Sequence, residues 1–293
     1  MRGIITVLNT PFTQSDAIDA EGVRRNVALA LEAGVAGFLV PALASEVGSL
    51  AELERALLVD TVVEATRGRV PIIGGASAAT QPERVRIARR LADAGCSGVL
   101  VNLPPGPEAD IERDVAELAE LAPEFLMLQD WDPVGPGLDI EFIARLSVRI
   151  PKFTWLKIEV VPAGPKYTRV LEATGGKLNV AGGWAVMQMI EALDRGVHAF
   201  MPTAMHRIYT RIYSLYSKGN RDSARELFER VLPVLAFTNQ RLDISIHFFK
   251  RLLCKQGVYA TARVRPPIAP LDAVHERIAD ELIERVREIE GHI

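Results

Sequence analysis

The sequence is poor in the residues that build disulfides and metal sites. Its 293 residues include two cysteines, Cys96 and Cys254, which lie far apart and belong to no Cys-x-x-Cys pair. The five histidines form no His-x-x-x-His pair and no His/Cys set with the spacing of metal ligands. We therefore expect two buried, reduced thiols, no disulfide and no metal site.

Long apolar runs and basic stripes are also missing. No run approaches the roughly 18 apolar residues that a membrane-spanning helix needs. The apolar run Ile4–Leu8 is soon ended by Pro11 and is too short for a signal peptide. The net charge is −3, and no stretch interleaves basic with aromatic residues. We expect a cytoplasmic protein that binds neither membranes nor nucleic acid.

What the chain does contain is a series of eight short apolar runs, each followed by a helical pattern such as Ala20–Glu32 or Gln81–Ala94. Continuous apolar runs are typical of parallel strands that are buried on both faces. Their regular spacing predicts an α/β protein with a (β/α)8 TIM barrel. An open doubly wound sheet is the alternative, although no Gly-x-Gly-x-x-Gly follows the first run. The runs are Ile4–Leu8, Gly37–Val40, Val70–Ile73, Gly98–Asn102, Phe125–Gln129, Thr154–Glu159, Leu178–Ala181 and Ala199–Met201.

After about residue 203 the pattern changes to helices without strands between them, and the proline-rich segment Arg263–Pro270 precedes the last helix. We therefore expect a barrel over residues 1–203 and a helical region over 204–293 that packs on the barrel and supplies subunit contacts. The expected helices are Met205–Ser217, Arg221–Phe237, Leu242–Lys255 and Ala273–Ile289.

The residue best suited to chemistry is Lys157, which lies inside the apolar run that ends at Glu159. A charged ammonium group is costly to bury, so this position favours the neutral, nucleophilic amine. Such an amine attacks a carbonyl group to form an imine, which then acts as an electron sink. Strand alternation places Glu159 on the same face as Lys157. A lysine that extends from the strand end into solvent is the alternative reading.

Other polar or small residues fall where the runs end, which is where a barrel gathers its active site. Ala44 and Ser45 follow the second run and enter a helix. Their backbone N–H groups and the Ser45 hydroxyl can hold a carboxylate, or can simply cap the helix. Gln129 ends the fifth run and Met201 ends the eighth. Gly182 begins a Gly-Gly pair that allows close backbone approach to a ligand, or forms a plain turn.

Together these features resemble the dihydrodipicolinate synthase / N-acetylneuraminate lyase superfamily over essentially the whole chain. The similarity rests on Thr10-Pro11-Phe12, on Ser45-Glu46, on the segment Arg69–Gly75 and on Lys157 in the sixth run. It implies a barrel with a three-helix C-terminal region, assembled as a homotetramer or a dimer of dimers. It also implies a covalent lysine imine with a small-molecule 2-oxo acid, and no separate cofactor.

The chain departs from the family pattern at several site positions. Ala42–Glu46 replaces the usual Gly-Thr-Thr-Gly-Glu, Gln129 replaces the tyrosine that relays protons, and no arginine follows the fifth run to bind a second carboxylate. Four short motifs are instead similar to the branch that contains L-2-keto-3-deoxyarabonate dehydratases. They are Leu128-Gln129-Asp130, Leu156-Lys157-Ile158-Glu159, Pro202-Thr203-Ala204-Met205 and the segment Arg265–Pro270.

These observations predict a lyase that acts on a 2-keto-3-deoxy sugar acid through an imine on Lys157, with dehydration favoured over aldol cleavage. The candidates for the base are Glu159, the substrate carboxylate and an ordered water. Gln129 orients groups or donates a hydrogen bond, and Ala44 and Ser45 hold the substrate carboxylate. Gly182 and Met201 are predicted to line the site. Three alternatives stay open: a non-catalytic 2-oxo acid-binding homologue, a synthase-like condensation with pyruvate, and an imine-free enzyme that binds phosphate at the Gly-Gly pair.

Overall fold

The computed structural model describes all 293 residues, apart from the side chains of Trp184 and Ala185. Eight parallel strands follow one another in chain order around a closed barrel, which confirms the predicted fold class. The strands are β1 (Gly3–Val7), β2 (Gly37–Leu39), β3 (Ile72–Gly75), β4 (Gly98–Val101), β5 (Phe125–Asp132), β6 (Phe153–Val160), β7 (Asn179–Gly182) and β8 (Ala199–Phe200).

A helix follows each of the first seven strands, and three short 3-10 helices lie in the connections. Local signals start several of these helices; Asp139, for example, accepts the N–H of Phe142 and begins α5. The helices are α1 (Ala20–Glu32), α2 (Glu52–Thr66), α3 (Gln81–Asp93), α4 (Glu108–Leu121), α5 (Ile140–Arg149), α6 (Gly164–Ala173) and α7 (Met189–Asp194), and the 3-10 helices are η1 (Leu43–Ser45), η2 (Val47–Ser49) and η3 (Trp184–Gln188).

The C-terminal part is helical, as the sequence predicts. It consists of α8 (His206–Ser217), α9 (Arg221–Thr238), α10 (Leu242–Lys255) and α11 (Ala273–Glu290). The chain divides into two compact units, residues 1–2 with 71–201 and residues 3–70 with 202–293. The helical tail thus shares a unit with the first strands and helices, and the predicted boundary between residues 203 and 204 stays a prediction.

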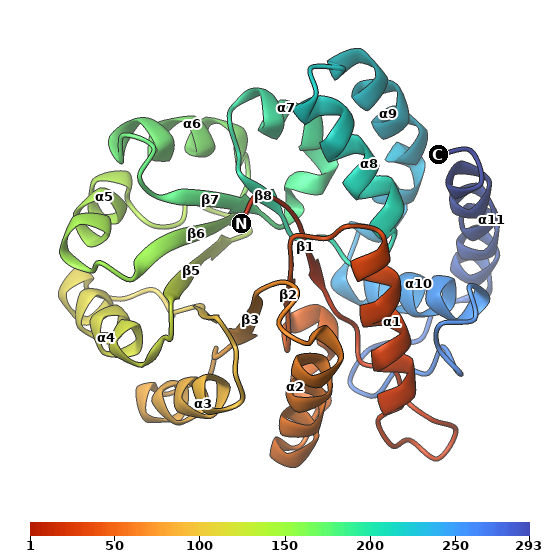
Figure 1. Cartoon of the computed structure of the whole chain (residues 1–293), viewed down its shortest axis with the longest axis horizontal. Coiled ribbons are helices and arrows are strands. Elements are labelled where there is room, and N and C mark those ends of the chain that lie inside the picture. Colours follow the sequence, from red (N-terminus) through yellow and green to blue (C-terminus); the bar gives the residue numbers. More distant parts are fainter. The chain divides into compact units, whose positions relative to one another are not determined.

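The first unit is built on β3 to β8, with α4, α5 and α6 on the outer side of the strands (Figure 1). Its longest strands are β5 and β6, which pair in register over most of their length. Gln129 on β5 lies opposite Lys157 on β6, which in turn lies opposite Ala181 on β7. The apolar residues of these strands are buried, as the continuous apolar runs predict, except for Trp131 near the end of β5.

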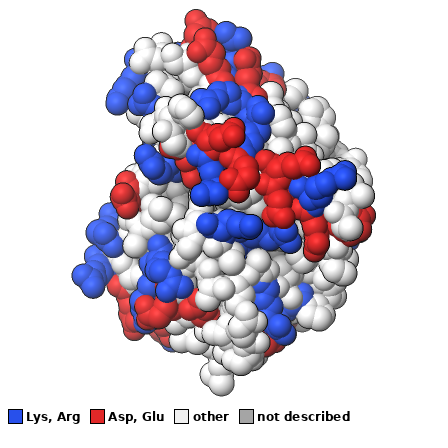
Figure 2. Space-filling view, turned by 90° about the vertical axis from the view of Figure 1, so that its right-hand side faces the viewer, with Lys and Arg blue, Asp and Glu red and all other residues white. Residues whose placement is uncertain are grey.

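The second unit pairs β1 with β2 and surrounds them with α1, α2 and the tail helices. In this unit α8 packs against β1 and α9, and α11 packs against α8 and α9. On the side that carries α11, acidic and basic side chains are interspersed (Figure 2). Ion pairs within α11, such as Arg287 with Glu284, contribute to this pattern.

Neither cysteine forms a disulfide. Cys96 is buried, as predicted, whereas Cys254 is only half-buried because it lies in the last turn of α10. Among the described residues, no helix combines the length and the apolar character that crossing a membrane requires.

Candidate active site

Lys157 and Glu159 form a nearly buried ion pair on β6. The two residues alternate with Ile158, so both side chains leave the strand on the same face. The Nζ atom of Lys157 lies 3.0 Å from Oε2 of Glu159, and the two side chains are 9% and 12% exposed. An amine and a carboxylate are therefore held in hydrogen-bonding contact with little competition from water.

Gln129 joins this pair from the neighbouring strand β5. Its side-chain Nε2 donates a hydrogen bond of 2.5 Å to Oε2 of Glu159. Asn102, which follows β4, donates from Nδ2 to the backbone carbonyl of Gln129 at 3.1 Å. One carboxylate oxygen of Glu159 is thus fixed between the amine of Lys157 and an amide that does not titrate.

The end of β7 completes this cluster with two glycines. Gly182 lies opposite Ile158, and its carbonyl accepts the N–H of Met201 at 3.0 Å, so both predicted residues belong to the strand framework. Gly183 lies against the side chain of Glu159. The sequence analysis named Gly183 only as part of the Gly-Gly pair and did not predict its contact with Glu159, although counting on along the paired strands sets Gly183 opposite Glu159.

The loop after β5 is held by two acidic side chains, the buried Asp130 and the half-buried Asp132, which are not among the predicted site residues. Asp132 accepts three backbone N–H groups of the loop. Asp130 accepts the N–H of Leu138 at 2.8 Å and forms an ion pair with Lys166 of α6. Burial raises the pKa of Asp130, and the bond to Lys166 opposes that rise. Both acids lie within three residues after Gln129 on β5, so the loop is anchored beside the cluster.

The predicted carboxylate-binding turn lies in the second unit and is held by the end of β1. Asn9 donates to the Ala44 carbonyl at 2.9 Å, and Thr10 donates to the Ser45 carbonyl at 2.6 Å. The Ser45 hydroxyl donates to the Leu8 carbonyl at 2.5 Å and accepts an N–H of its own turn. Because the hydroxyl hydrogen of Ser45 is already donated to Leu8, backbone N–H groups are the better donors for a substrate carboxylate. Carboxylate binding by this turn stays a prediction.

The same turn is tied to the helical tail through Glu46, which adopts a left-handed backbone conformation with φ 57°. Glu46 forms a fully buried ion pair with Lys250 of α10 and accepts the N–H of Arg265 at 2.9 Å. The cations of Lys250 and Arg265 also lie 4.2 and 4.1 Å from the ring centre of Phe12. Burial lowers the pKa of Lys250 to about 8, and the charge of Glu46 opposes that shift.

The two histidines near β8 have structural surroundings. His206 is buried, and its ring nitrogens bond to Thr6 and Asn26 at 3.1 and 2.9 Å. Burial lowers its pKa to about 4. His198 accepts the N–H of Val180 at 3.0 Å and stacks edge-on against Trp155. In the part of the chain that the structure describes, no group of three or more His, Cys, Asp or Glu side chains could hold a metal ion.

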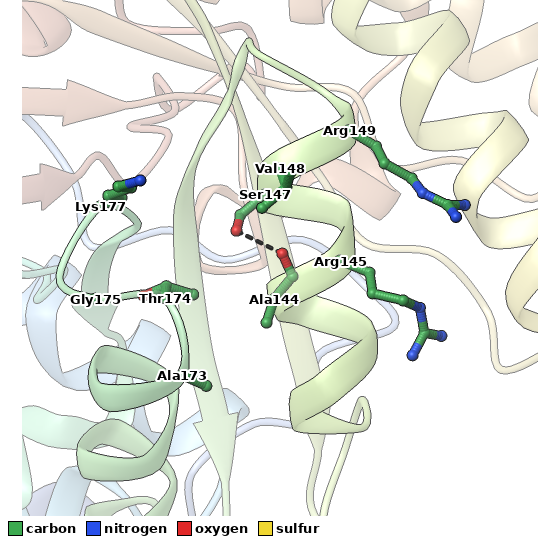
Figure 3. Close-up of a pocket in the computed structure, with 9 residues that line it drawn as sticks. All are labelled: Ala144, Arg145, Ser147, Val148, Arg149, Ala173, Thr174, Gly175 and Lys177. Carbon is green, nitrogen blue, oxygen red and sulfur yellow. Dashed lines mark hydrogen bonds between the residues drawn. The ribbon is translucent and has the colours of Figure 1, made fainter.

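A pocket of about 790 Å³ lies elsewhere in the first unit, between the ends of α5 and α6 (Figure 3). Its lining residues precede β6 and β7, so it belongs to the N-terminal ends of the strands, where barrels do not keep their active sites. In the close-up (Figure 3), the side chains of Arg145 and Arg149 point away from Thr174 and Lys177. The hydroxyl group of Ser147 donates to the backbone carbonyl of Ala144. We assign no chemistry to this pocket.

Comparison with known proteins agrees with this architecture. The sequence matches the dihydrodipicolinate synthetase family over residues 1–286. A 4-hydroxy-tetrahydrodipicolinate synthase of Methanosarcina barkeri is 26% identical over 296 residues, which covers 96% of this chain and 97% of the relative. An L-2-keto-3-deoxyarabonate dehydratase of Azospirillum brasilense is 27% identical over 300 residues, which covers 99% and 94%.

Solved structures show the same fold at lower identity. A dihydrodipicolinate synthase of Rhodopseudomonas palustris superposes with a TM-score of 0.89 at 23% identity and covers 97% of each chain. A sialic acid aldolase of Ruminococcus gnavus has a TM-score of 0.89 at 16% identity, with 99% of this chain and 98% of the aldolase covered. Because the family match spans nearly all of its residues, the chain belongs to the dihydrodipicolinate synthetase family.

Proposed function

We propose that the protein is a lyase that binds a 2-oxo acid as an imine on Lys157 and removes water from a 2-keto-3-deoxy sugar acid. The observation that carries this proposal is the Glu159 carboxylate, which lies 3.0 Å from the Lys157 amine and is held by Gln129. The dehydratase name of the Azospirillum brasilense relative supports the same chemistry. The reaction needs no cofactor besides the imine.

In the first step Glu159 accepts a proton from the Lys157 ammonium group, which the short contact between them permits. The neutral amine attacks C2 of the substrate. The C2 oxygen then leaves as water with the proton that Glu159 took up, which leaves a protonated imine and restores the Glu159 carboxylate. The positive imine withdraws electrons from C3 and acidifies its hydrogens. We propose, as the sequence predicts, that the turn of Ala44 and Ser45 binds the substrate carboxylate.

In the second step a single carboxyl group acts as base and then as acid. Glu159 removes a proton from C3, and the electron pair moves into the imine to give an enamine. The electrons then return, the C3–C4 double bond forms, and the C4 hydroxyl leaves as water with the proton that Glu159 took up. Hydrolysis of the unsaturated imine releases the product and restores Lys157. Gln129 keeps the carboxylate in place and takes no part in the proton transfer.

The segments that follow the strands carry no basic side chains, which supports a substrate that is uncharged at the end away from its 2-oxo acid group. None of the eight segments between a strand and the next helix contains Lys, Arg or His. The cations that reach these segments come from helices and from the tail, and several of them are bound to carboxylates: Lys166 to Asp130, Lys250 to Glu46 and Arg265 to Glu54. Hydroxyl groups suit such surroundings better than the second carboxylate of a synthase-type substrate or a phosphate does.

Two related activities would use the same imine. Aldol cleavage requires the base to take the proton of the C4 hydroxyl, after which the C3–C4 bond breaks. Condensation with pyruvate, in line with the synthase names of several relatives, starts from the pyruvate imine. A non-catalytic homologue would form the imine and stop there. The products of the reaction therefore separate these activities, and imine formation alone does not.

Borohydride trapping tests the first half of the proposal. The purified protein is incubated with pyruvate and sodium borohydride, digested and analysed by mass spectrometry. We expect a stable adduct on Lys157 and none in the matched variant Lys157→Met. Absence of any adduct, with pyruvate and with longer 2-oxo acids, would rule out the imine mechanism.

Turnover of 2-keto-3-deoxy acids with five and six carbons tests the second half. We expect loss of one water from the substrate, and no pyruvate among the products. In Glu159→Gln, trapping should remain while turnover falls by about 100-fold or more, the usual effect of removing a general base. Release of pyruvate would establish aldol cleavage instead, and a trapped adduct without any turnover would favour the binding homologue.

A further inference from the structure

Gly183 is a glycine whose backbone does not require one. It follows the last residue of β7, and its φ of −82° and ψ of −69° fall in the right-handed region that every residue adopts. Many glycines of this chain instead have positive φ, where a side chain would be strained. The reason for a glycine at this position must lie in the space around it.

That space is filled by the side chains of the proposed catalytic pair. A Cβ atom at position 183 would overlap Oε1 of Glu159, and it would lie 2.5 Å from Cδ of Glu159 and 2.9 Å from Cε of Lys157. The other carboxylate oxygen, Oε2, faces Lys157 and Gln129. The carboxylate is therefore enclosed by β5, by β6 and by the end of β7. On the β7 side it fits only because Gly183 has no side chain.

We infer that Gly183 is a positioning residue that sets the place of the Glu159 carboxylate beside Lys157, an inference that rests on the proposed function. A side chain at position 183 pushes the carboxylate out of this place. A base transfers a proton only within hydrogen-bonding distance of it. A displacement of about 1 Å is enough to lower a rate by about 100-fold.

The substitution Gly183→Ala separates this role from a merely structural one. The three nearest atoms to the new methyl group belong to the ends of two flexible side chains, and none belongs to the backbone. The side chains can turn aside without moving β6 or β7, so the variant should fold. Gly106→Ala is the matched control, because Gly106 also follows a strand of the first unit and its nearest neighbour, a backbone oxygen of Pro104, lies 4.0 Å from an added Cβ.

We expect Gly183→Ala to keep the circular dichroism spectrum and the melting temperature of the wild type. Pyruvate should still be trapped on Lys157 after a long incubation, because water can take up the ammonium proton that Glu159 otherwise accepts. Turnover of the 2-keto-3-deoxy acid should fall by about 100-fold, as it does when a base is misplaced. Gly106→Ala should trap and turn over like the wild type.

Two double variants show whether the loss acts through Glu159. Combined with Glu159→Gln, Gly183→Ala should cause no further loss of turnover, because both changes remove the same carboxylate. Combined with Glu159→Asp, which shortens the side chain by one methylene group, it should be more active than Gly183→Ala alone. A structural defect would not respond to the length of residue 159.

The inference is overturned if Gly183→Ala turns over like the wild type, or if its loss multiplies with that of Glu159→Gln. These outcomes differ from failure of the proposed function, in which the wild-type protein itself traps no 2-oxo acid or releases no product. That failure would remove the basis of the inference as well.

Discussion

Lys166 of α6 and Asp130 of β5 form an ion pair of 2.5 Å that is almost completely buried. The same ammonium group donates to the carbonyls of Pro136 and Leu138, and Asp130 accepts the N–H of Leu138. Gly137, with φ 68°, has no side chain that would overlap Asp130. The loop that follows Gln129 is therefore fastened from the helix side of the barrel, which leaves its other side to the proposed site.

Lys166→Met should release this loop. The variant leaves the Asp130 carboxylate and two loop carbonyls buried without their partner, which costs about 3–5 kcal/mol for a buried pair. We expect faster amide hydrogen exchange in residues 133–139 and lower turnover, while β6 stays protected. Lys177→Met, a change at an exposed lysine of the same unit, is the control. Equal exchange of this loop in both variants would contradict the anchoring role.

Gln129→Leu should separate imine formation from proton transfer. The change removes the hydrogen bond that Gln129 donates to Glu159, and it puts an apolar side chain of similar size in the place of the amide. A hydrogen bond to a charged group contributes about 1.5–3 kcal/mol, so turnover should fall by about 10- to 100-fold. Borohydride trapping on Lys157 should stay close to that of the wild type. A variant that loses trapping and turnover together would show that Gln129 serves the amine and not Glu159.

The buried pair of Lys250 and Glu46 should behave differently in single and double variants. Lys250→Met leaves the Glu46 carboxylate fully buried without its partner, and the free energy of unfolding should fall by about 3–5 kcal/mol. Adding Glu46→Gln removes the unpaired charge and should restore most of that loss. Urea unfolding followed by circular dichroism measures both effects. A double variant that is less stable than Lys250→Met would contradict this account, and it can be measured even if the single variant fails to fold.

Much of the fold could be predicted because its signals are local. The helix Leu242–Lys255 was predicted with the bounds that α10 has, since its apolar period and its flanking residues mark both ends. The predicted fifth strand ended at Gln129, whereas β5 continues to Asp132. Polar residues there suggested a loop, but the backbone stays paired with β6 and Asp130 is satisfied by Lys166.

Only the part of the site that lies on a single strand could be predicted, from the alternation of side chains along that strand. Lys157 and Glu159 are two residues apart, so the sequence alone sets them on one face. The hydrogen bond between Gln129 and Glu159 joins residues 30 positions apart and depends on the register of β5 with β6. Glu46 and Lys250 are 204 positions apart, and neither residue carries a sequence signal that points to the other.

His206 should make stability depend on pH in a defined window. Burial lowers its pKa to about 4 in the folded protein, below the ordinary value of 6.5. Between these values the unfolded chain takes up a proton that the folded protein does not, so the folded state loses stability as the pH falls below 6.5. From pH 6.5 to pH 5 this loss amounts to about 2 kcal/mol.

The variant His206→Gln isolates this contribution, because glutamine keeps a polar side chain at the position and does not titrate. Carboxylates elsewhere titrate equally in both proteins, so the difference between the two curves belongs to His206. We expect the free energy of unfolding of the wild type, measured in urea at pH 7 and pH 5, to fall by about 2 kcal/mol more than that of the variant. Parallel curves would mean that His206 takes up its proton in the folded protein as readily as in the unfolded chain, contrary to its burial between Thr6 and Asn26.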